Sequence, residues 1–71
     1  GAGCAKSPED VCNHLEKLAK KEAGAKAAKS ANKGCVKRWK RAKEMKGYFK
    51  YRKMSRCVTS ADSLSAAVKC K

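Results

Sequence analysis

The sequence has few large apolar residues and no long apolar run. No stretch of apolar residues exceeds three, whereas a membrane-spanning helix needs about 20. Isoleucine is absent, and only 13 of the 71 residues are large apolar side chains. A chain of this length buries only about 60% of its unfolded surface. The hydrophobic core is therefore small, and we expect covalent cross-links to supplement it.

Acidic residues are scarce as well. Six Asp and Glu stand against 19 Lys and Arg, so the formal net charge is +13. A charge of this size repels itself and is typical of a protein that meets an anionic partner. We expect no small-molecule substrate and no cofactor.

The C-x-x-C spacing is missing, which excludes the thioredoxin-like redox motif and the common zinc fingers. Cysteine itself is abundant, with five in 71 residues. Dense cysteine in a short chain is typical of oxidising compartments, here the periplasm, the cell surface or the extracellular medium. An alternative uses Cys12 and His14 as zinc ligands, but on a helix these two side chains point about 200° apart, so we expect no metal.

Helical patterns run along most of the sequence. A capping serine, Ser7, precedes a proline at the first helical position, and the apolar spacing continues to about residue 22. The Ala/Lys-rich residues 23–33 contain no large apolar side chain; they are either a weakly held helical extension or a mobile connector, and we favour the connector. Further helices are predicted over about 33–46 and 48–58.

A short last helix is predicted after a cap at Thr59 or Ser60, with Leu64, Ala67 and Val68 facing inward. Alternation of period two is absent, so no strand is expected. The fold class predicted is all-α, a small disulfide-stapled bundle of three or four short helices. It forms one domain over residues 7–71, after a flexible segment at 1–6.

Four cysteines fall one in each of the predicted helices. They are Cys12, Cys35, Cys57 and Cys70. Two disulfides among them allow three connectivities, and the sequence does not choose between these. Each would contribute about 2–4 kcal/mol. Cys4 is left over, either as an ordinary fifth cysteine or as a lipidation site, because the opening residues 1–4 read as a tag remnant or as the end of a processed leader.

The most informative segment is residues 33–56, which carries eleven basic residues, one acid and all four aromatics. Cations attract phosphates or sulfates, and planar rings can stack on bases or sugars. Trp39, Tyr48 and Tyr51 are expected to fill the core, whereas Phe49 lies off the apolar stripe and is the best candidate for an exposed ring. The predicted polyanion-binding residues are Lys37, Arg38, Lys40, Arg41, Phe49, Lys50, Arg52, Lys53 and Arg56.

Several of these residues together resemble a known group of proteins. The run 10–14 (Asp-Val-Cys-x-His), the pair Cys35 and Trp39, the pair 57–58 (Cys-Val), Ala61, Leu64 and Cys70 are similar to small four-cysteine helical lipoproteins of myxobacteria and related bacteria. The resemblance covers nearly all of residues 4–71. It implies a leader that ends at Cys4, two disulfides, and residence in the periplasm or at the cell surface. It implies no activity.

The function expected is non-enzymatic binding of polyanions outside the cytoplasm, with DNA or RNA as the first candidate and acidic polysaccharide or lipopolysaccharide as the second. One alternative is a cationic membrane-active antibacterial or toxin-type effector that binds an anionic membrane surface. Another is a small nuclease that uses His14 as acid or base, which a single histidine and six scattered acids disfavour.

Overall fold

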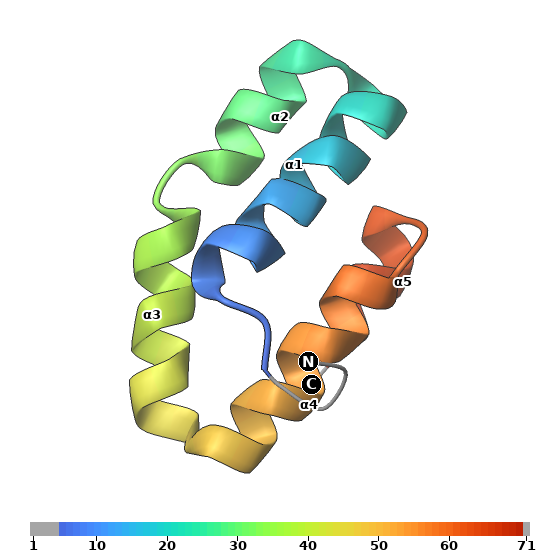
Figure 1. Cartoon of the computed structure of the whole chain (residues 1–71). Helices are drawn as coiled ribbons and strands as arrows, with labels where there is room; N and C mark the ends of the chain where they lie inside the picture. Colours follow the sequence, from blue (N-terminus) through green and yellow to red (C-terminus); the bar gives the residue numbers. More distant parts are fainter. Residues whose placement is uncertain (1–4, 71) are drawn as a thin grey trace.

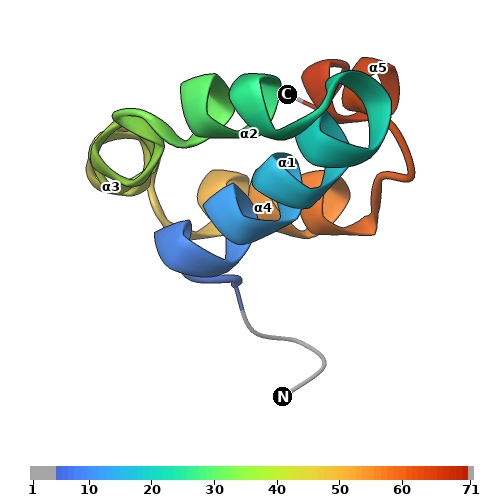
Figure 2. The same ribbon diagram turned by 90° about the horizontal axis from the view of Figure 1, so that it is seen from above.

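The protein is a bundle of helices in a computed structural model that describes residues 5–70. Within that part of the chain there are five helices and no strand: α1 (Pro8–Ala23), α2 (Ala25–Asn32), α3 (Cys35–Lys46), α4 (Tyr48–Ser60) and α5 (Leu64–Val68). Helix α1 lies at the centre and packs against the other four (Figure 1). Viewed from above, α3 is seen nearly end-on at one side of the bundle (Figure 2). The all-α, disulfide-stapled fold is confirmed.

Helix α1 begins where its capping sequence predicts. The Ser7 hydroxyl accepts a hydrogen bond from the Asp10 amide at 3.0 Å, and Pro8 opens the first turn. Proline lacks the amide hydrogen that this position would leave unpaired, so it costs nothing there. Val11, Cys12, Leu18 and Ala19 form the buried face of this helix.

The core is small, as the composition predicts. Its buried cluster consists of Val11, Leu18, Val58, Ala61 and Ala67, which come from α1, from α4 and the residue that follows it, and from α5. Four partly buried side chains pack against it, and these are Leu15, Trp39, Leu64 and Cys70. Because two of the five buried members are alanines, hydrophobic burial alone gives this bundle little stability.

Two disulfides join the helices around this core. Cys12 of α1 is bonded to Cys35 of α3, with 5.9 Å between their Cα atoms, and Cys57 of α4 is bonded to Cys70, with 5.8 Å. The first bridge is buried and ties the beginning of α3 to the central helix. Of the three connectivities left open by the sequence, this is the one that forms. Cys4 lies outside the described residues.

The connector favoured for residues 23–33 is wrong, because this segment contains α2. Gly24 adopts a φ of +91°, which side chains rarely tolerate, and it reverses the chain so that α2 runs back along α1. Alanine has the highest helix propensity, and Ala28 is small enough to be buried at the contact with α1. The Cys12–Cys35 bridge then holds the far end of α2 near α1.

Two expectations for the last helix are also wrong. Its cap is Ser63, whose hydroxyl accepts from the Ala66 amide at 3.1 Å, while the Thr59 hydroxyl donates to the Ser55 carbonyl within α4. Val68 is 74% exposed, although it was expected to face inward. A five-residue helix has too few turns to bury a broad face, so α5 packs through Leu64 and Ala67 only. Among the described residues, no helix is long and apolar enough to cross a membrane.

Candidate polyanion-binding surface

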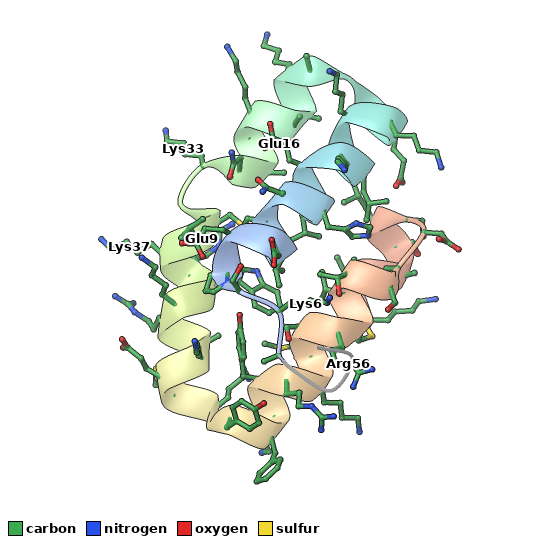
Figure 3. The ribbon with its side chains drawn as sticks, in the orientation of Figure 1. Lys6, Glu9, Glu16, Lys33, Lys37 and Arg56 are labelled. Carbon is green, nitrogen blue, oxygen red and sulfur yellow. A yellow bond between two sulfur atoms is a disulfide. The ribbon has the colours of Figure 1, made fainter. Side chains whose placement is uncertain are left out.

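The cations of α3 and α4 face outward because Trp39 of α3 and Tyr51 of α4 face inward. Tyr51 is fully buried, and the half-buried Trp39 packs against it with ring centroids 6.0 Å apart in an edge-to-face arrangement. This pair fixes how the two helices are rotated about their axes. The predicted cations on the remaining faces are exposed, as Figure 3 shows for Lys37, except for Arg52, which is half-buried.

Tyr51 also connects α4 to the segment that precedes α1. Its hydroxyl donates to the Lys6 carbonyl at 2.6 Å, and the Lys6 amide donates to the hydroxyl of the buried Ser55 at 3.2 Å. Burial raises the pKa of the Tyr51 hydroxyl above its ordinary value of 10.0, and the carboxylates of Glu9 and Asp10 raise it further. The hydroxyl therefore keeps its proton and remains a donor at physiological pH.

An open hollow runs along the outer face of α4. Its volume is about 590 Å³, and we call it the α4 hollow; it is lined by Phe49, Arg52, Lys53, Arg56, Cys57 and Ser60. These positions recur every three or four residues, so they occupy successive turns of one helix face. Among residues 5–70, no carboxylate side chain lines this hollow, so it is suited to an anionic ligand.

Phe49 is the exposed ring of this hollow. It is 80% exposed, as the sequence predicts, and its ring meets that of Tyr48 at 79° with 5.6 Å between centroids. The expectation that Tyr48 fills the core is wrong, because Tyr48 is 54% exposed at the corner where α3 ends and α4 begins. The two rings therefore remain on the surface. Gly47 makes that corner with a φ of +80°.

A second group of predicted residues meets on α3. Lys37, Arg38 and Arg41 line a hollow of about 320 Å³ together with Gly34, and we call these four residues the α3 patch. The guanidinium of Arg38 also donates to the Lys33 carbonyl at 3.3 Å, at the end of α2. Arg38 therefore contributes to the α2–α3 corner as well as to the patch.

The structure divides the predicted surface into these two parts. In Figure 3, Lys37 of the α3 patch and Arg56 of the α4 hollow lie on opposite sides of the view. Lys40 belongs to neither group as defined, because it lines a hollow shared with Lys43, Glu9 and Glu44. Lys50 is exposed on α4. A ligand that contacts both groups must therefore extend around the α3–α4 corner.

Several of the acidic residues have structural contacts elsewhere. Glu22 accepts a hydrogen bond from the Leu64 amide at 2.8 Å, which attaches the start of α5 to the end of α1. Glu16 accepts from the Asn32 side chain at 3.1 Å, which attaches α2 to α1, and Figure 3 shows Glu16 next to α2. Both carboxylates are thus used to hold helices together, away from the α4 hollow.

His14 is not placed for metal binding with Cys12. The Cys12 sulfur is bonded to Cys35, and the His14 Nε2 donates to the Ala61 carbonyl at 2.7 Å. No group of three or more metal-ligating side chains occurs between residues 5 and 70. His14 and Asp10 do line a shallow hollow of about 440 Å³ with Lys6, Asn13, Lys17 and Thr59.

Sequence reasoning missed some lining residues of the two hollows. Ser60 and Cys57 complete the α4 hollow, and Gly34 completes the α3 patch. Helical spacing was the available signal, because Ser60 follows Arg56 by four residues and Gly34 precedes Lys37 by three.

Comparison of the chain with family models, with curated proteins and with solved structures finds no match.

Proposed function

We propose that this is a non-enzymatic, extracytoplasmic protein that binds polyanions, with nucleic acid as the first candidate ligand and acidic polysaccharide as the second. The observation that carries the proposal is the grouping in the α4 hollow, where Arg52, Lys53 and Arg56 follow an exposed Phe49 along one helix face. Cations and an accessible ring on one face are what ligands with phosphates and planar groups require.

The α3 patch supplies a second set of cations to the same long ligand. Binding by such side chains releases the counterions of the polyanion, so affinity falls steeply with salt. Contacts to phosphate carry no sequence information. The protein is therefore proposed to hold its ligand without sequence specificity.

The proposed location is the periplasm, the cell surface or the extracellular medium. Two disulfides are consistent with an oxidising compartment. Lipidation at Cys4, as in the lipoproteins that the sequence resembles, would keep the protein at a membrane surface and leave the helical domain free to bind.

The test is fluorescence anisotropy with labelled single-stranded DNA, duplex DNA and heparin between about 50 and 300 mM salt. If about six cations contact phosphates, the logarithm of the affinity for duplex DNA falls with the logarithm of salt at a slope of about −5. The proposal would be contradicted if binding to all three ligands were seen only at low salt and were lost before the salt concentration reached about 150 mM. Any protein with this net charge binds polyanions weakly at low salt.

A matched pair of double variants separates the surface from the overall charge. Lys37→Ala with Arg41→Ala removes two cations of the α3 patch and spares Arg38, which also contacts the Lys33 carbonyl. Lys20→Ala with Lys21→Ala removes the same charge from the last turn of α1. We expect the first pair to reduce the steepness of the salt slope by about two, as the loss of two phosphate contacts requires, and the second pair to leave it unchanged. Equal effects of the two pairs would show that the patch has no role.

A further inference from the structure

We infer that the α4 hollow is a subsite for an unpaired nucleotide, whose base stacks on Phe49 while its phosphates contact the cations of the following turns. This inference rests on the proposed polyanion-binding function and narrows its ligand to single-stranded nucleic acid. Three features of the hollow carry it, namely the exposure of the ring, the order of the side chains along the helix, and the presence of a single large apolar side chain among the described residues that line it.

The ring of Phe49 is accessible and still has a defined neighbour. The Phe49 side chain is 80% exposed, so it contributes little hydrophobic stabilisation to the fold. Core packing therefore does not explain why a large apolar ring occupies this position. The edge-to-face contact with Tyr48 limits how freely the ring moves. An exposed ring with restricted motion is a suitable platform for a base, because less conformational entropy is lost when the base stacks on it.

Within the α4 hollow, the cations follow the ring toward the C-terminal end of α4. Lys53 is one turn after Phe49 and Arg56 is two turns after it, about 10.5 Å along the helix axis. Ser60 lies one turn further and offers a hydroxyl that can donate to a phosphate or base edge. A strand lying along α4 would thus meet the ring first and its phosphates would then meet successive cations.

Duplex DNA and a lipid bilayer fit this hollow less well. In a duplex the flat face of each base is covered by the neighbouring base pairs, so Phe49 cannot stack on it. An unpaired base exposes this face. An interfacial helix inserts a broad apolar face into lipid. Among the described residues that line the α4 hollow, Phe49 is the one large apolar side chain, and the others are cationic or small.

The experiment compares labelled dT15 with an oligonucleotide of the same length in which the central bases are replaced by abasic sites. The two strands carry the same phosphates, so their difference in affinity at about 150 mM salt reports stacking. The variants are Phe49→Ala and a matched control, Met45→Ala, which removes another exposed apolar side chain (79% exposed) near the same corner. Circular dichroism establishes that both variants remain helical.

We expect Phe49→Ala to weaken binding of dT15 by about 5- to 150-fold, the range for loss of one base–aromatic stack. Its affinity for the abasic strand and for heparin should remain within about twofold of the parent protein. Met45→Ala should behave as the parent on all three ligands. Phe49→Trp should retain the affinity for dT15, because it keeps a stacking ring.

Two outcomes would overturn the inference and leave the proposed function intact. One is equal affinity of the parent for dT15 and the abasic strand, and the other is equal binding of dT15 by Phe49→Ala and Met45→Ala. If Phe49→Ala instead loses binding to vesicles of phosphatidylglycerol with phosphatidylcholine while dT15 binding is unchanged, the ring serves a membrane. Failure of the parent to bind dT15, duplex DNA and heparin at this salt would reject both the inference and the proposed function.

Discussion

The hydroxyl of Tyr51 connects α4 to the segment that precedes α1. Tyr51 is fully buried, and its hydroxyl donates to the Lys6 carbonyl at 2.6 Å. Replacement by phenylalanine keeps the ring against Trp39 and leaves that carbonyl without its donor. We expect Tyr51→Phe to lower the free energy of unfolding by about 1–2 kcal/mol, measured by urea denaturation. Tyr48→Phe removes the same atom from a 54% exposed ring and should change stability by less than about 0.5 kcal/mol.

The same pair of variants has a defined pH dependence. Burial and the nearby Glu9 and Asp10 raise the pKa of Tyr51 above the ordinary value of 10.0, so the folded state keeps this proton at a pH where the unfolded chain loses it. The contribution of Tyr51 to stability is therefore complete below pH 10 and declines as the pH rises above it. The stability advantage of the parent over Tyr51→Phe should shrink as the pH rises above 10. A constant difference would contradict the raised pKa.

At the scale of elements, the two disulfides stabilise different parts of the bundle. The Cys57–Cys70 bridge attaches the end of the short α5 to α4, and α5 is held in addition by the Glu22–Leu64 hydrogen bond and by Ala67 in the core. A bridge that closes a loop of this length contributes about 3 kcal/mol. We expect Cys57→Ala with Cys70→Ala to speed amide exchange mainly in α5 and to leave most of the helical circular dichroism signal.

Loss of the other bridge should have the larger effect. The Cys12–Cys35 bridge has a sequence separation of 23, against 13 for the Cys57–Cys70 bridge, so it closes the longer loop. Both cysteines are 1% exposed, so their joint replacement by alanine also leaves space in the interior. We expect this variant to lose most of its helical signal at 25 °C, because small domains have only about 5 kcal/mol to lose. If the Cys57 and Cys70 variant unfolded first, α5 would be the element on which the bundle depends.

The sequence predicts the helices that carry their own signals. Helix α1 has Ser7 and Pro8 at its start, and α3 and α4 are separated by Gly47, so all three were placed to within a few residues. Helix α2 was missed because its stability comes from packing on α1 and from the reversal at Gly24. The cap of α5 was misplaced because Thr59 and Ser63 are both of residue types that commonly cap helices. The hydrogen bond that anchors the start of α5 joins Leu64 to Glu22, which is 42 residues earlier in the sequence, so local patterns do not reveal it.

In the candidate site, too, some features follow from local sequence signals and others depend on tertiary packing. Net charge and the exposure of Phe49 follow from the sequence alone, because both depend on residue type and helical spacing. The separation of Lys37 from Arg56 does not, since it depends on the angle between α3 and α4 at Gly47 and on the seating of Trp39 against Tyr51. Local spacing therefore predicts each cationic face, whereas tertiary packing decides whether the faces adjoin.

For the whole molecule, the formal net charge of +13 opposes folding. Bringing the cations into a molecule with a radius of gyration of 11.6 Å places many of them within one or two Debye lengths of each other, since this length is about 10 Å at 0.1 M salt. Added salt should therefore stabilise the protein. We expect the thermal midpoint to rise by about 5 °C between 20 and 200 mM NaCl, which corresponds to ~1 kcal/mol for a domain of this size.

Sodium sulfate at equal ionic strength distinguishes screening from anion binding. Screening alone predicts the same midpoint in both salts, whereas a doubly charged anion held in the α3 patch or the α4 hollow would raise the midpoint further, because a ligand that binds only the folded state stabilises it. Lys37→Ala with Arg41→Ala should reduce any such excess if the anion lies in the α3 patch. A midpoint that falls with added NaCl would mean that attraction between the six acids and their neighbouring cations outweighs the repulsion of the net charge.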